Sequence, residues 1–261
     1  MRQYGFLAVE GPTDVEFVGR LLRLSGLNRV RLADEVDGFW RGLIPKEWPP
    51  CGDLMKRVPV PGFFQSDSHS VAVRSADGFE RLVSSVLLMR SQLHSDEWSE
   101  VAALGVLADA DWKDHPSDRF QRLKDDFQGI GLPIPVSGPG EVSEGRPRIG
   151  IYVFPDNRSQ GTLEDLLDEC AAKIYPGLRD GARAFVDGVD RTALTAEDLE
   201  EVAKLSGETK ARLACLAGFL VPGSTLQVSV ARNRWLRDDA LAIGNIGAVH
   251  RFLNHLLGLN A

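Results

Sequence analysis

The 261-residue sequence contains few cysteines, and this shortage excludes two kinds of architecture. The three cysteines, Cys51, Cys170 and Cys215, are odd in number and far apart. A disulfide framework or a CxxC metal site needs paired or closely spaced cysteines, so neither is expected. Reduced thiols are typical of cytosolic proteins. Cys215 lies in an apolar run, where we expect it to be buried.

Long apolar runs are also missing. No run approaches the roughly 20 residues that a membrane-spanning helix needs. The first apolar stretch is short and is interrupted by Glu10, which is unlike a signal peptide. These absences predict a cytoplasmic protein that does not enter a membrane.

Several well-known catalytic motifs are absent. The sequence has no G-x-x-x-x-G-K-[ST] phosphate-binding loop, so any ATPase would be a separate partner protein. No histidine cluster has zinc-ligand spacing. His115 follows an acidic turn, but a lone histidine there is more often an exposed loop residue.

Charge is unevenly distributed along the chain. The formal net charge is -7, which does not favour nucleic-acid binding by the whole chain. Between residues 204 and 251, however, there are seven Lys/Arg against three Asp/Glu. Arg232, Arg234 and Arg237 surround Trp235 and are candidates for contacts to a phosphate backbone of DNA or RNA. Alternatively, Trp235 anchors the last helices and the arginines are solvated.

Strand and helix patterns alternate over the first two thirds of the chain. Short apolar runs at 4–9, 101–108 and 149–154 predict buried strands, with briefer ones at 71–74 and 134–136. Thr13 with Glu16, and Thr162 alone, are predicted to cap the helices that follow the first and third runs. The alternation predicts an α/β fold with a mostly parallel sheet flanked by helices and a helical C-terminal part.

Two parts are expected. Residues 1–176 would form the α/β core, with an inserted segment rich in Pro and Trp at about 28–69. The prolines in that segment disfavour long helices and central strands, and its aromatic residues favour an ordered insertion or lid. Residues 177–261 would form a helical part packed on the core.

Two acidic turns follow predicted strands. Glu10 and Asp14 flank a Gly-Pro turn after the first strand, and Asp109 and Asp111 follow the run at 101–108. In an open parallel sheet, ligands bind outside the carboxyl ends of the strands. Residues i and i+2 of an extended chain point the same way, so Asp109 and Asp111 are expected to face one ion. If the two turns meet, they predict a Mg²⁺ or Mn²⁺ site for phosphate chemistry.

Each carboxylate also has a plainer interpretation. Asp and Glu are common in turns and at helix starts, and a single Asp-x-Asp is usually a solvated loop. Asp14 could simply be an acid in the first turn of a helix. Two acidic turns that both follow buried strands make the metal site the stronger hypothesis.

The stretch 9–14 (Val-Glu-Gly-Pro-Thr-Asp) and the stretch 108–111 (Ala-Asp-Ala-Asp) resemble the Toprim domain, which has a Rossmann-like fold. This domain occurs in topoisomerases, bacterial primases and overcoming-lysogenisation-defect nucleases. The rest of the chain is similar to an uncharacterised Toprim-related family of unknown function. The matching features there are residues 154–157, residues 161–167, a Lys210-Ala211 helix and a closing helix.

The resemblance implies a role for each matching residue. Glu10 matches the Toprim glutamate, a general acid/base or metal ligand, and Asp109 and Asp111 match the metal-binding pair. Asp14 and Glu164 match acids that hold a second ion in the nuclease branch. Lys210 is loosely aligned with a lysine that stabilises developing charge there.

Three interpretations remain open on this basis. The leading hypothesis is a Mg²⁺-dependent phosphoryl-transfer protein, most plausibly a nuclease that cleaves a phosphodiester. The alternative is a non-catalytic nucleotide- or nucleic-acid-binding module, or one subunit of a defence complex. A third option is a scaffold whose carboxylates are paired with arginines.

Overall fold

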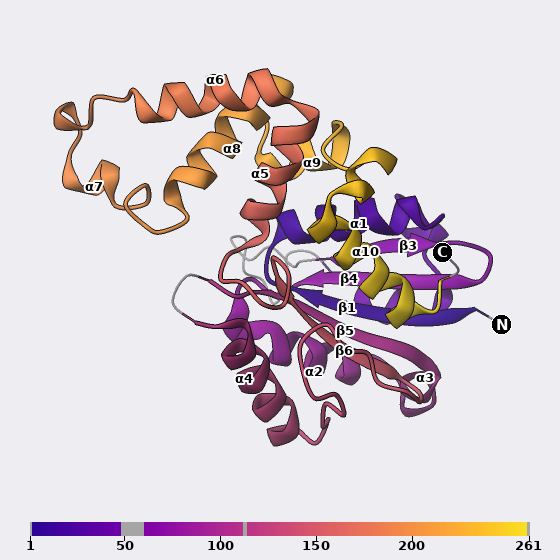
Figure 1. The fold of residues 1–261 in the computed structure, drawn as a ribbon. Coiled ribbons are helices and arrows are strands. Elements are labelled where there is room, and N and C mark those ends of the chain that lie inside the picture. The colour runs from indigo at the N-terminus through magenta and orange to yellow at the C-terminus, as the bar shows by residue number, and fades with distance from the viewer. Residues whose placement is uncertain (1, 48–59, 112–113, 260–261) are drawn as a thin grey trace.

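The computed structural model describes residues 2–47, 60–111 and 114–259, and its centre is a six-stranded sheet in the order β2-β3-β4-β1-β5-β6 (Figure 1). The strands are β1 (Gln3–Val9), β2 (Asn28–Arg29), β3 (Gly62–Gln65), β4 (His69–Ser75), β5 (Val101–Asp109) and β6 (Arg148–Phe154). β1, β4, β5 and β6 are parallel to one another, whereas β3 runs antiparallel to both β4 and β2. The chain is therefore a mixed α/β protein with a mostly parallel sheet.

Helices cover both faces of this sheet. The α-helices are α1 (Pro12–Leu24), α2 (Leu82–Gln92), α3 (Ser95–Glu100), α4 (Pro116–Gly129), α5 (Leu163–Ile174), α6 (Pro176–Asp187), α7 (Ala196–Leu199), α8 (Gly207–Leu220), α9 (Leu226–Arg232) and α10 (Gly244–Leu257). Short 3-10 helices are η1 (Ala33–Glu35), η2 (Gly38–Leu43), η4 (Phe79–Arg81), η5 (Arg191–Ala193) and η6 (Asp238–Ala242). α1 and α10 lie on one face, and α2 and α4 lie on the other (Figure 1).

Each face of the sheet buries its own apolar core. The core under α1 and α10 includes Phe17, Phe154 and Leu253. The core under α2 and α4 includes Leu104 and Phe127. Because both faces are covered, the central strands β1 and β5 are almost continuously apolar, which is the pattern of buried parallel strands.

The segment 28–69 differs in part from the expectation of an insertion. Gly62–Gln65 forms β3, which is paired on both sides, directly after Pro61. A proline beside a strand is compatible with pairing because the ladder does not need its missing N–H. Trp40 and Phe64 are fully buried, as expected for packed aromatics. Residues 48–59, including Trp48, lie outside the described residues.

Two local predictions were wrong. The cap of α1 is Gly11, not Thr13, because Pro12 occupies the first helical position, where its missing N–H costs nothing. Asp14 then accepts the Gly11 N–H at 3.2 Å, which is the half of a capping box that a glycine N-cap permits. In the run 134–136, Ile134 and Val136 are buried and Pro135 is exposed, but the run forms no strand. Thr162, by contrast, is the N-cap residue of α5 as predicted.

The C-terminal helices share a core with the sheet. Leu213 of α8 and Trp235 are buried in the same cluster as Phe17 of α1. α6, α7 and α8 extend away from the sheet as an arm (Figure 1). Cys215 on α8 is only half-buried, unlike the expectation, because it lines a hollow that is also lined by Val186 of α6. Among the described residues, no helix is long and apolar enough to cross a membrane.

Candidate functional site

The carboxyl ends of the four parallel strands lie along one edge of the sheet. These ends are Val9, Ser75, Asp109 and Phe154, and the residues after them form the turns at that edge. The pairing of Val9 with Leu107 brings the turn after β1 beside the end of β5. In parallel α/β sheets this edge is where ligands bind.

Glu10 and Asp109 are in direct contact at this edge. The Asp109 backbone N–H donates to Glu10 Oε1 at 2.7 Å, although the residues are 99 positions apart. The two acidic turns, remote in sequence, are therefore neighbours in the structure. This hydrogen bond fixes the Glu10 carboxylate over the end of β5.

Asp14 and Asp109 are each held by one backbone amide. Asp14 accepts the Gly11 N–H, and Asp109 Oδ1 accepts the Leu163 N–H at the start of α5 at 2.8 Å. Asp14 Oδ1 is buried and has no hydrogen-bond partner within the described parts of the chain. Asp14 thus uses one oxygen for orientation and has its other oxygen buried without a partner.

Burial and mutual repulsion raise the pKa values of these acids. Burial raises the pKa of Glu10 to about 7, and repulsion from Asp111 and Glu164 adds to this shift. The hydrogen bond from the Asp109 amide acts in the opposite direction and lowers the pKa. Burial, followed by repulsion from Glu10 and Glu164, raises the pKa of Asp14 to about 8. The pKa of Asp109 is also raised, first by burial and then by Asp14. The carboxylates therefore form one electrostatic cluster.

Glu164, which belongs to this cluster, forms an ion pair with a lysine. It lies in the first turn of α5, and its Oε1 is 3.8 Å from Nζ of Lys210 on α8. Its side chain is largely buried, whereas that of Lys210 is more than half exposed. Of the described residues, Lys210 is the one cation within ion-pair distance of Glu10, Asp14, Asp109 or Glu164.

Asp111, expected to face the same ion as Asp109, has an arginine partner in this structure. It adopts a φ of 58°, so the chain at this residue is not extended. Its carboxylate pairs with Arg119, whose Nε also lies 3.1 Å from Asp114, while its charge still acts on Glu10. The Arg119 guanidinium stacks over the Phe79 ring, with 4.2 Å to the centroid. Nothing in the sequence distinguished Arg119 from other helical arginines.

The chemistry of the donors fits a hard divalent cation. All are carboxylate oxygens, which Mg²⁺ prefers, and the partnerless Asp14 Oδ1 offers an oxygen that a cation would satisfy. In the part of the chain that is described, no three His, Cys, Asp or Glu side chains are already arranged to hold a metal ion. The side chains must therefore move closer together to coordinate one.

The three candidate arginines of the C-terminal part lie apart from the carboxylates. Arg232, Arg234 and Arg237 are exposed, and no contact between described residues links them to the acidic cluster. Trp235 is fully buried and lies against Tyr175, so the anchoring role is correct. The sequence did not indicate Arg20 of α1, which donates to the Leu236 carbonyl at 2.7 Å. Its spacing to Arg23 on the polar face of α1 was the available signal.

Fold and site together define a class: an α/β protein with a carboxylate cluster at the carboxyl ends of its parallel strands. The chain belongs to the family described as "Protein of unknown function (DUF3226)", whose profile matches residues 4–257. A solved structure of a hypothetical protein from Pyrococcus horikoshii OT3 is similar at 18% identity and a TM-score of 0.46, covering 98% of this chain and 95% of that one. No curated protein matches the sequence.

Proposed function

We propose that this chain is a Toprim-like, Mg²⁺-dependent phosphoryl-transfer protein, most plausibly a nuclease that cleaves a phosphodiester. The hydrogen bond between Glu10 and the Asp109 amide carries the proposal, because it brings two sequence-remote acidic turns into one cluster. Asp14 and Glu164 contribute to the same electrostatic field. Mn²⁺ is an alternative ion with similar oxygen preferences.

The residues of the cluster divide into distinct roles. Glu10, Asp14, Asp109 and Glu164 would hold the divalent ion, which when bound supplies charge neutralisation and a more acidic water. Glu10, whose pKa is about 7, can accept a proton near neutral pH. Lys210, beside Glu164, provides positive charge where the phosphate charge develops. Asp111 and Arg119 form the rim of the site.

A nucleic-acid substrate is supported by the arginines near the junction of α1 and the segment after α9. The pKa of Arg20 is lowered, first by burial and then by the positive charges of Arg23 and Arg237. The three arginines are therefore close together. Within the described chain, none of these arginines has an acidic side chain at ion-pair distance, in contrast to Arg179 or Arg212. An unneutralised basic patch favours phosphate contacts.

The second candidate function is a non-catalytic nucleotide- or nucleic-acid-binding module, working alone or in a complex with a separate ATPase. Two ion pairs favour it: Asp111 with Arg119, and Glu164 with Lys210. These cations neutralise acids that a two-ion nuclease would need for metal. The overall charge of -7 also favours it.

One experiment separates the two functions. Asp109→Asn preserves shape but removes the charge at the centre of the cluster, and Asp126→Asn on the exposed face of α4 is the matched control. Cleavage of single- and double-stranded DNA and RNA is measured with Mg²⁺ and Mn²⁺, alongside Mg²⁺ binding by calorimetry. A nuclease loses activity and metal binding only in Asp109→Asn. Metal binding without turnover in the wild type supports the module, and cleavage by Asp109→Asn at the wild-type rate rejects this site.

A further inference from the structure

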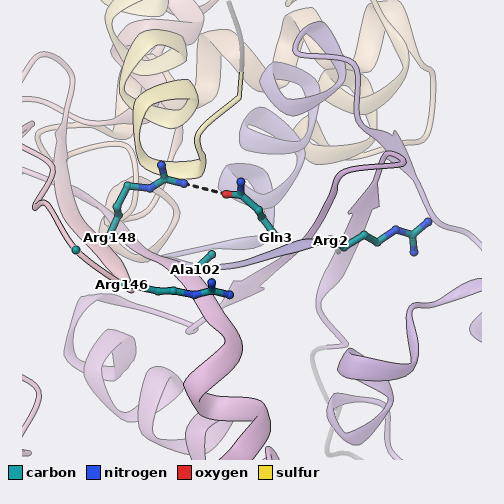
Figure 2. A pocket seen from close by; sticks show the side chains of 6 residues that line it. Arg2, Gln3, Ala102, Arg146 and Arg148 are labelled. Carbon is teal, nitrogen blue, oxygen red and sulfur yellow. Dashed lines mark hydrogen bonds between the residues drawn. The ribbon is translucent and has the colours of Figure 1, made fainter.

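A polar pocket lies at the amino ends of β1, β5 and β6, at the opposite end of the strands from the carboxylates (Figure 2). Its volume is about 340 Å³, and it is lined by Arg2, Gln3, Ala102, Gly145, Arg146 and Arg148. Lining of this kind is cationic and contains no acidic side chain. A hollow of this size is at the lower end of the range for small-ligand sites, roughly 300 Å³.

The hollow exists because the middle strand places a small side chain there. β5 runs between β1 and β6, and its pairing with β1 shifts between Tyr4 and Gly5. Tyr4 pairs with Val101 and Gly5 with Ala103, so Ala102 is the extra residue of a β-bulge. Only a methyl group occupies the floor between the flanking side chains. Bulges commonly re-aim side chains beside functional sites.

Two guanidinium groups of this pocket lack a counter-charge. Arg148 donates to Gln3 Oε1 at 3.3 Å, and Arg146 donates to the carbonyl oxygen of Glu100 at 3.0 Å. Over the described ranges, neither has a carboxylate within 4.0 Å. Arg2 is different, because it pairs with Asp37 at 2.8 Å and its guanidinium points away from the other two (Figure 2).

Arg148 is partly buried without full compensation. Its Nε is buried and has no hydrogen-bond partner among the residues described. Burial also lowers the pKa of its guanidinium. A desolvated cation with a spare donor is costly unless an anion offsets it. A phosphate oxygen is suited to this purpose, because guanidinium groups bind oxyanions through two parallel N–H donors.

We propose that this pocket binds a single phosphate group, either as inorganic phosphate or on a nucleoside monophosphate, between Arg146 and Arg148. The Gln3 amide group and the Ala102 bulge shape the floor of the site. This site is separate from the carboxylate cluster and does not depend on metal binding there.

Binding is tested by calorimetric titration of the whole chain with inorganic phosphate and, separately, with adenosine monophosphate. The double variant Arg146→Gln plus Arg148→Gln removes both cations and keeps polar side chains. The control Arg31→Gln plus Arg81→Gln makes the same charge change at two exposed positions elsewhere. Ala102→Leu fills the hollow and leaves every charge unchanged. Circular dichroism establishes that each variant is folded.

The pocket variants are expected to weaken phosphate binding by roughly tenfold or more, which is the loss of one or two charge-assisted hydrogen bonds, while the control binds like the wild type. Competition between the two ligands supports a shared site. Tighter binding of adenosine monophosphate than of inorganic phosphate identifies a nucleoside monophosphate as the preferred ligand. No binding by the wild type overturns the proposal. Unchanged binding in Ala102→Leu and the double variant, or an equal loss in the control, also overturns it. If the double variant does not fold, phosphate binding by Ala102→Leu alone tests the proposal.

Discussion

The ammonium group of Lys210 lies 3.8 Å from the carboxylate of Glu164, and this contact joins the arm helix α8 to the start of α5. The arm formed by α6, α7 and α8 extends away from the sheet (Figure 1). Of the cations in the described part of the arm, Lys210 is the one within ion-pair distance of the acidic cluster. A role in charge stabilisation therefore predicts an effect on turnover that is much larger than its effect on folding.

Lys210→Gln is expected to lower turnover by roughly a hundredfold, the usual loss for one charge-stabilising donor. Its effect on the free energy of unfolding should stay below about 1 kcal/mol, because the Lys210 ammonium is more than half exposed and lies 3.8 Å from Glu164, and such loose ion pairs contribute little to stability. Lys204→Gln is the control, since Lys204 is exposed on the same arm and its ion pair within the described residues is with Glu201. Steady-state kinetics and urea unfolding are the measurements. Equal turnover in both variants would remove Lys210 from the proposed mechanism.

The raised pKa of Asp14 predicts how the stability of the metal-free protein depends on pH. Its pKa is raised from 3.8 to about 8, so the folded state binds this proton more tightly than the unfolded chain. That stabilisation is complete below about pH 4, near the ordinary pKa of an aspartate, and is lost as pH rises through about 8. The metal-free protein should therefore become less stable between these pH values, and added Mg²⁺ should reverse the loss by binding the folded state.

Asp14→Asn tests this dependence directly. The amide stays neutral, so the gain of the variant over the metal-free wild type should grow as pH rises from about 4 to about 8, by up to about 1.4 kcal/mol for each pH unit, and should therefore be much larger at pH 8.5 than at pH 5. It should also lose much of the stabilisation by Mg²⁺. Thermal unfolding with chelator and with Mg²⁺ measures both effects, and Asp126→Asn is the control. A wild-type melting temperature that does not change with pH over this range would contradict the clustering of the acids.

The sequence predicted the strands that carry the site but not its detailed geometry. The runs ending at Val9 and Asp109 are recognisable because strands buried on both faces are continuously apolar. The position of Asp111 could not be read in the same way, since its side chain direction depends on one left-handed backbone angle. The pocket lined by Arg146 and Arg148 could not be predicted from the sequence either, because it depends on a bulge at Ala102 and on the register of β6.

Trp235 supplies a test of how the C-terminal part is attached. Its ring is fully buried against Tyr175, and its Nε1–H donates to Ser229 Oγ at 3.0 Å. Trp235→Ala should reduce the free energy of unfolding by about 3–5 kcal/mol, as for other buried aromatic residues. Trp98→Ala is the comparison, because Trp98 is only partly buried and lies under Arg90. Urea unfolding that shows similar losses for both would mean that Trp235 does not anchor the last helices.

The arginine patch near α1 predicts salt-dependent binding of single-stranded nucleic acid. Arg23 and Arg237 are exposed, and their positive charges both act on Arg20. If both contact phosphates, Arg23→Gln plus Arg237→Gln should weaken binding and reduce the slope of log K against log salt by about 0.7 for each lost contact. Fluorescence anisotropy at several salt concentrations measures the slope, with Arg31→Gln plus Arg81→Gln as the matched control. Because metal chemistry is not involved, this result is independent of the carboxylate cluster: an unchanged slope would place the nucleic acid elsewhere, even if the protein cleaves it.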